Sequence, residues 1–195
     1  TGETNHAGTT KMNIRRDAGV AMMKFWNQIE TRFPNIASET AVWTVGAVKL
    51  MPGQPSIIPG EAEMIFQFRD VELETLKKLD DELVSIANQV SEESKTEIDI
   101  EKSADGVPAH FNENFISIME ATAKDILPGK YKLMSSGAQH DAQVFASIIP
   151  TAMVFVPSIN GVSHHWTENT SDEDIVNGFE YFVEAMRRIL QTRNK

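Results

Sequence analysis

The chain has 195 residues, enough for one domain or two small ones with a hydrophobic core. Its formal net charge of −10 argues against a nucleic-acid partner, and it has no apolar run long enough to span a membrane. Cysteine is absent, which excludes disulfides and thiolate chemistry, fits a cytoplasmic location, and leaves histidine and carboxylates as the ligands for any metal.

Residues 15–33 carry apolar side chains at helical spacing up to Pro34, which predicts a helix. The pattern predicts two strands, at 40–50 and 61–69, on either side of a Pro/Gly-rich loop at 51–60. It predicts a second amphipathic helix at 72–91. The alternation in 95–102 predicts another strand. This α–β–β–α–β order needs one strand before His6 to complete a split ferredoxin-like unit.

The pattern changes after "SADGVPAH" at 103–110. We expect a helix at 112–126, a buried strand at 151–157 and a final helix from residue 172. Ser171 and Asp174 have the spacing of a capping box before that last helix. Helix and strand alternate in this part as they do in an α/β sheet.

The loop "NGVSHHWTENT" follows the predicted buried strand, where α/β folds place ligands. His164 and His165 are adjacent, so their side chains diverge, and one could face a site while the other caps the loop. Glu168 could orient an imidazole. The spacing alone favours two surface histidines and a solvated acid, because no recognised pair of metal ligands is present.

In "SSGAQHDAQ", small residues precede His140 and Asp141, which suggests a tight turn into a helix start. His140 could bind a substrate or a metal-bound carboxylate, or the pair could only cap the helix. Arg69 could hold a substrate carboxylate, although a cross-strand ion pair with Glu61 or Glu63 is the commoner arrangement.

His6 lies among small residues in "NHAGTT", which leaves room around its imidazole. A histidine in such a place could stabilise a developing oxyanion. A single histidine near the terminus supports no more than that by itself.

Four motifs occur in one order along the chain: "NHAGTTKMNIRRDA", "PSIIPGEAEMIFQFRD", "SSGAQHDAQVFA" and "AMVFVPSINGVSHHWTENT". Together they resemble the amidase/hydantoinase/carbamoylase family, which includes N-carbamoyl-L-amino-acid hydrolases, β-ureidopropionase and allantoate amidohydrolase. This family belongs to the dinuclear, aminoacylase-like metallopeptidase superfamily. The resemblance covers essentially the whole chain.

The resemblance implies an α/β fold in which a ferredoxin-like lid domain, which also dimerises, accompanies a metallopeptidase-type catalytic domain. Residues 1–105 correspond to the lid, with its first strand largely missing, and 106–195 to the C-terminal portion of the catalytic domain. The implied activity is metal-dependent hydrolysis of the carbamoyl C–N bond of N-carbamoyl-L-amino acids or a ureido acid such as allantoate. Two divalent ions, zinc, manganese or cobalt, are implied for the intact enzyme.

By the same resemblance, His164 matches the last metal ligand, His6 a lid histidine that reaches the substrate, often across the dimer, and Arg69 the arginine that grips the substrate carboxylate. Ser56 stands where many members carry an Asn that binds the same carboxylate, and His140 is a substrate-binding candidate. Two further departures from the pattern are Lys11, where Pro is usual, and Gln139, where Gly is usual.

The other metal ligands and the general-base Glu of the family lie before the lid, so we expect this chain to be a C-terminal fragment that does not retain the two ions and is inactive alone. A non-catalytic dimerisation or ligand-binding module is the alternative. A third hypothesis is a self-contained site made of His140, Asp141, His164 and Glu168.

Overall fold

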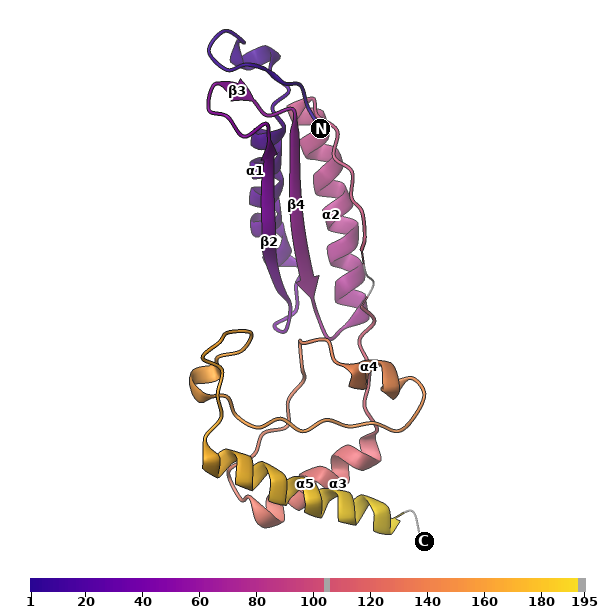
Figure 1. The fold of residues 1–195 in the computed structure, drawn as a ribbon. Helices are drawn as coiled ribbons and strands as arrows, with labels where there is room; N and C mark the ends of the chain where they lie inside the picture. Colours follow the sequence, from indigo (N-terminus) through magenta and orange to yellow (C-terminus); the bar gives the residue numbers. More distant parts are fainter. Residues whose placement is uncertain (104–105, 193–195) are drawn as a thin grey trace. The chain divides into compact units, whose positions relative to one another are not determined.

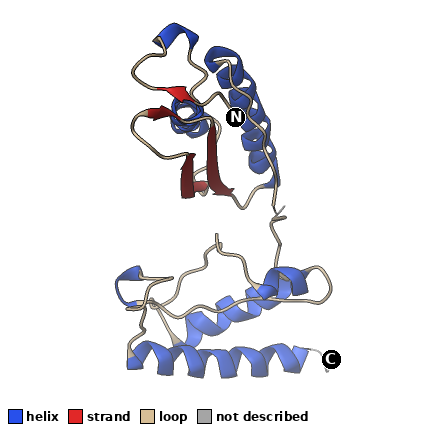
Figure 2. Cartoon of the chain, turned by 45° about the horizontal axis from the view of Figure 1, so that its top comes forward, coloured by secondary structure: helices blue, strands red, loops and turns tan. Residues whose placement is uncertain are grey.

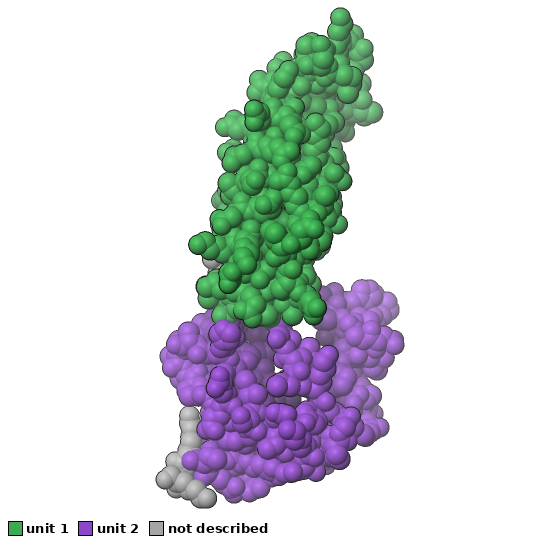
Figure 3. Space-filling view, turned by 180° about the vertical axis from the view of Figure 1, so that it is seen from behind, with its two compact units in different colours: residues 1–108 green, residues 109–195 purple. Residues whose placement is uncertain are grey.

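The computed structural model describes residues 1–103 and 106–192. The chain divides into two compact units, residues 1–108 and 109–195, which Figure 3 colours green and purple. Helices and strands are mixed in the first unit, as predicted (Figure 2). No helix in the described part of the chain has both the length and the apolarity needed to cross a bilayer.

The first helix, α1, runs from Ala18 to Arg32, within the predicted span. Asp17 caps its start, because the carboxylate accepts a hydrogen bond from the Val20 amide at 3.0 Å. The predicted stop is confirmed: Pro34 lies in a short 3₁₀ turn, Phe33–Asn35, that follows the helix directly.

Strands β2 (Val42–Met51) and β4 (Glu61–Arg69) form an antiparallel hairpin. Its register pairs Val42 with Arg69 at one end and Met51 with Glu61 at the other. The register shifts at Gly46, which has no partner in the ladder. One extra residue reverses the alternation of inward and outward side chains along β2. Apolar side chains therefore face the helices both before and after this bulge.

Helix α2 (Leu73–Ser94) lies beside α1 on one face of the hairpin (Figure 1). Phe33 is fully buried at the centre of this layer, with edge-to-face contacts to Trp43 at 5.6 Å and Phe68 at 5.9 Å between ring centroids. Buried side chains of α2, among them Leu79 and Ile86, complete the core. The order α1–β2–β4–α2 is the predicted α–β–β–α order.

Two differences from the predicted strands concern this unit. Strand β3 (Ile57–Ile58) lies within the expected loop and pairs with β1 (Asn5–His6). The predicted strand at 95–102 is wrong, since these residues form no strand. Thr1 and Glu97 exchange two backbone hydrogen bonds, but no described strand lies beside the residues that follow, and alternation without a ladder partner does not make a strand.

The second unit is built on helices α3 (Glu113–Ile126) and α5 (Asp172–Thr192), which lie side by side (Figure 2). Met119, Ala185 and Ile189 form their shared core. The predicted capping box is confirmed, because the Asp174 amide donates to the Ser171 hydroxyl at 3.1 Å. In α5, hydrogen bonds from Arg187 and Arg188 lower the pKa of Glu184 from 4.5 to about 2.

The predicted buried strand at 151–157 is wrong, because the segment is extended but forms no strand. Ala152 and Val154 pack against the α3–α5 core, whereas Phe155 and Val156 are exposed. The described part of the second unit contains no strand that could pair with residues 151–157. The segment therefore lacks the neighbours that bury a parallel strand on both faces.

Candidate functional site

His6 and Ser56 are brought together at one end of the first unit. The β1–β3 pairing sets His6 opposite Ile57, and the next amide along, that of Ala7, donates to the Ser56 carbonyl at 2.9 Å. Both side chains are exposed. An imidazole and a hydroxyl are therefore both accessible to a small molecule at this end of the unit.

The His6 imidazole is fixed by its own turn. The Gly8 amide donates to His6 Nδ1 at 3.0 Å, and the Thr10 hydroxyl donates to the His6 carbonyl at 2.8 Å. A Cβ at Gly8 would lie 3.2 Å from His6 Cε1, so glycine allows this close approach of backbone to ring. Sequence reasoning missed Gly8 as the partner of the His6 ring, although it lies in the quoted motif.

Arg69 lies at the other end of the hairpin from His6 and Ser56. It is the last residue of β4, whose first residue, Glu61, pairs with Met51 near β3. Eight residues of extended chain span about 26 Å, at ~3.3 Å per residue. One chain therefore cannot bring His6 and Arg69 to the same small substrate.

The half-buried Arg69 guanidinium donates to the Gln67 side chain at 3.0 Å. The alternative of an ion pair with Glu61 or Glu63 is wrong. These carboxylates stand eight and six residues away on the same strand, which is about 20 Å or more.

His140 precedes helix α4 (Asp141–Ala146), and Asp141 lies in its first turn as predicted. His140 occupies the N-cap position and its carbonyl accepts the Gln143 amide at 2.9 Å, but its side chain makes no capping hydrogen bond. The His140 ring lies 5.5 Å from that of Phe155, tilted by 59°, and its Nε2 is buried with no hydrogen-bond partner in the described chain. A buried imidazole nitrogen without a partner is costly, which fits a group kept for a ligand.

The exposed His164 has a left-handed backbone conformation, with φ of 55°. Glu168 accepts a hydrogen bond from the His164 backbone amide at 3.0 Å, so it holds this backbone, which neither the imidazole-orienting role nor the solvated acid of the two alternatives described. His165 Nδ1 lies 2.8 Å from the Thr167 hydroxyl, which gives His165 the predicted role of capping the loop.

The metal-ligand chemistry of these residues does not fit a dinuclear centre. Over residues 1–103 and 106–192, no group of three or more His, Asp or Glu side chains is arranged to hold a metal ion. The hypothesis of a self-contained site made of His140, Asp141, His164 and Glu168 is therefore wrong. Of the residues predicted for the site, His164 alone is matched to a metal ligand, and one ligand does not hold two ions.

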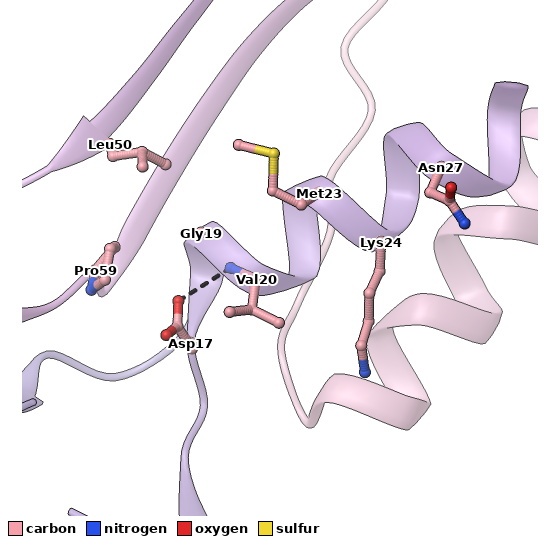
Figure 4. Close-up of a pocket in the computed structure, with 8 residues that line it drawn as sticks. All are labelled: Asp17, Gly19, Val20, Met23, Lys24, Asn27, Leu50 and Pro59. Carbon is pink, nitrogen blue, oxygen red and sulfur yellow. Dashed lines mark hydrogen bonds between the residues drawn. The ribbon is translucent and has the colours of Figure 1, made fainter. Parts of the chain in front are cut away.

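A pocket of about 500 Å³ lies between α1 and the end of β2 (Figure 4). Most of its walls are apolar, with Asp17, Lys24 and Asn27 as polar members. Val20 and Met23, both about half exposed, point away from the core stripe of α1. Their position off that stripe is the sequence signal that could have revealed this apolar surface.

Comparison with known proteins covers nearly the whole chain. The model of peptidase family M20/M25/M40 matches residues 6–188. The chain is 33% identical over 178 residues to allantoate amidohydrolase of Escherichia coli (strain K12), covering 91% of this chain and 43% of the relative. It is 34% identical over 185 residues to N-carbamoyl-L-amino-acid amidohydrolase of Pseudomonas sp. (strain NS671), covering 95% of this chain and 44% of the relative.

Among solved structures, an amidase of the hydantoinase/carbamoylase family from Burkholderia phymatum matches with a TM-score of 0.88 and 36% identity. The match covers 98% of this chain and 46% of that one. The chain thus spans less than half the length of the relatives that it matches. The family match over most of its length shows that the chain belongs to peptidase family M20/M25/M40.

Proposed function

We propose that the chain acts in a hydrolase that cleaves the carbamoyl C–N bond of N-carbamoyl-L-amino acids or a related ureido acid such as allantoate. The names of the similar proteins support this substrate class. The observation that carries the proposal is the pairing of β1 with β3, because it brings His6 and Ser56, both with exposed side chains, to the same end of the first unit.

In this proposal, water adds to the carbamoyl carbon, and His6 donates a hydrogen bond to the oxyanion that forms there. Such a donor is worth about 10²–10³ in rate. One C–N bond of the carbamoyl group then breaks as a proton from the water passes to the leaving nitrogen. The carbamic acid that remains loses carbon dioxide, so that an N-carbamoyl amino acid yields ammonia, carbon dioxide and the amino acid. Arg69 holds the α-carboxylate through its planar fork of donors, and the Ser56 hydroxyl donates a further hydrogen bond to that carboxylate.

The second unit contributes His140, whose buried and unpartnered Nε2 would bind the substrate, and His164, which would be one metal ligand. Two divalent ions, zinc, manganese or cobalt, are the cofactors that the resemblance implies, and their identity stays a prediction. A cytoplasmic location also stays a prediction from the sequence.

We assign residues 1–105 to a lid and dimerisation domain and 106–195 to the C-terminal portion of a catalytic domain. The separation of His6 from Arg69 supports dimerisation, because one substrate can meet both only if they come from different copies. The exposed side of β2 suits such a contact: in the described sheet β2 pairs only with β4, and the apolar pocket between α1 and β2 lies along the same side.

A two-fold axis through the middle of β2 would pair this strand antiparallel with its copy. The Val42 end of one β2 would then lie beside the Met51 end of the other. Because Val42 is paired with Arg69, and Met51 lies near β3, this arrangement brings Arg69 of one copy towards His6 and Ser56 of the second.

The test is ammonia release by the full-length gene product, with divalent metal, from N-carbamoyl-L-amino acids and allantoate. We expect Arg69→Ala to raise KM about 10- to 100-fold, since a hydrogen bond to a charged group contributes about 1.5–3 kcal/mol. An N-carbamoyl amine without a carboxylate is the control and should react equally poorly with both proteins. Equal KM values for the carboxylate substrates would contradict the role of Arg69.

The second candidate is a non-catalytic dimerisation or ligand-binding module, which the apolar surface beside β2 favours. A full-length gene product that dimerises but releases no ammonia from any of these substrates would support this candidate over the hydrolase.

A further inference from the structure

Arg15 lies just before α1 and reaches back to the turn that follows His6. Its Nε donates to the Thr10 carbonyl at 3.0 Å, and its Nη2 donates to the Ala7 carbonyl. The side chain is half-buried. One guanidinium therefore ties together the two ends of the segment 7–10.

The same segment holds the His6 ring. The backbone carbonyl of His6 accepts hydrogen bonds from the Thr10 hydroxyl at 2.8 Å and from the Thr10 amide at 3.1 Å. The turn therefore closes back on His6. The Gly8 amide, between the two carbonyls bound by Arg15, donates to His6 Nδ1 at 3.0 Å. The amide that fixes the ring is thus itself fixed by Arg15.

This contact decides the proton position on the neutral imidazole. Nδ1 accepts the Gly8 hydrogen, so it carries no proton of its own, and the ring proton must be on Nε2. His6 is then a hydrogen-bond donor through Nε2, which is what stabilisation of an oxyanion requires. The opposite tautomer would set two N–H groups against each other at Gly8 and offer a lone pair to the substrate.

We propose that Arg15 is a positioning residue that holds His6 in its Nε2–H form by clamping the carbonyls of Ala7 and Thr10. The catalytic meaning of this tautomer rests on the proposed function; the clamp itself does not. Lysine would not replace Arg15 fully, because a point charge on a flexible stem cannot bind two carbonyls in one plane as a guanidinium fork does.

Arg16 provides a matched control. It is the next residue and carries the same charge, but its Nε donates to the Lys95 carbonyl at 2.8 Å, and its guanidinium lies 4.0 Å from Glu3. Neither contact touches the His6 turn. A change at Arg16 therefore alters net charge and local packing without releasing the clamp.

The test is nitrogen NMR of the 195-residue chain labelled with ¹⁵N-histidine, at about pH 8, above the usual histidine pKa of ~6.5. His6→Gln identifies the His6 signals by their loss. In the wild-type chain we expect two well-separated His6 ring signals, with the proton on Nε2. In Arg15→Gln these two signals should move towards each other, as the tautomers mix, while Arg16→Gln leaves them unchanged.

Proton placement on Nδ1 in the wild-type chain, or unchanged His6 signals in a folded Arg15→Gln, would overturn the proposal. If Arg15→Gln does not fold, Arg15→Lys takes its place, because lysine keeps the charge but cannot bind two carbonyls in one plane. Unchanged His6 signals in Arg15→Lys would then overturn the proposal.

Kinetics of the full-length gene product then separate this proposal from the proposed function. We expect Arg15→Gln to lower kcat about 10- to 100-fold with little change in KM, because a misplaced group costs up to about 10² in rate. Arg15→Lys should recover part of this loss, and Arg16→Gln should match wild type. A wild-type protein without activity would refute the proposed function, while the NMR result would still decide whether Arg15 fixes the His6 tautomer.

Discussion

His6 and Arg69 stand at opposite ends of a nine-residue strand, and this separation predicts how two inactivated copies behave together. The strand spans about 26 Å, much longer than an N-carbamoyl amino acid. If each site takes His6 from one copy and Arg69 from the other, a dimer of one His6→Ala copy and one Arg69→Ala copy has one intact site and one site without either group.

The assay uses the full-length gene product, with a different affinity tag on each copy, so that tandem purification yields only mixed dimers. We expect this mixed dimer to release ammonia at about half the wild-type rate, since one of its two sites is complete. The His6→Ala homodimer should be slower than wild type by about 10²–10³. The substrate concentration is kept well below the wild-type KM, where Arg69→Ala also slows the reaction about 10- to 100-fold. If each site formed within one copy, the mixed dimer would therefore be at least about tenfold slower than a dimer with shared sites.

A crossed control makes the result decisive. A dimer of one wild-type copy and one copy carrying both His6→Ala and Arg69→Ala has one defect in every site if the sites are shared. It should then be as slow as the homodimeric variants, whereas sites formed within one copy would leave it half active. Half activity in this control, with little activity in the first mixed dimer, would refute the shared site.

Other measurements address the interface, the core, a carboxylate and the metal. Met23→Glu, on the apolar side of α1, should convert a dimer to a monomer in sedimentation, whereas Leu73→Glu, at an equally exposed apolar position on α2, should not. Phe33→Ala should lower the free energy of unfolding in urea by about 3–5 kcal/mol, because it empties a fully buried site. The Glu184 carboxyl should titrate near pH 2 by ¹³C NMR, and a midpoint near 4.5 would contradict its two arginine contacts. Its contribution to the stability of the fold is complete above pH 4.5 and is lost as the pH falls towards 2. Elemental mass spectrometry of the dialysed 195-residue chain should find far less than one divalent ion per chain, since His164 is the one residue matched to a metal ligand, and about two ions would overturn this prediction.

The bounds of α1 and α2 could be predicted from the sequence to within three residues. Apolar spacing predicted α1 and α2, and the Ser171–Asp174 pair marked the start of α5. These features depend on contacts between residues three or four positions apart, which the sequence contains directly. The ordered motifs also identified the family that the comparison with known proteins shows.

The strands and the site depended on tertiary structure. Alternation predicted a strand at 95–102, and a buried strand was expected at 151–157. A strand exists only where another segment offers a ladder, and neither segment has one in the described chain. No local pattern indicated that Glu168 binds a backbone amide or that Arg15 ties the His6 turn.

The sequence by itself thus determined which residue types are available for chemistry and which segments are helical. Only the tertiary structure decided which of those residues meet. It joined His6 to Ser56 through one backbone pairing and separated both from Arg69 by the length of β4, because distances across a sheet depend on the pairing and direction of its strands and not on the spacing of residues along the chain.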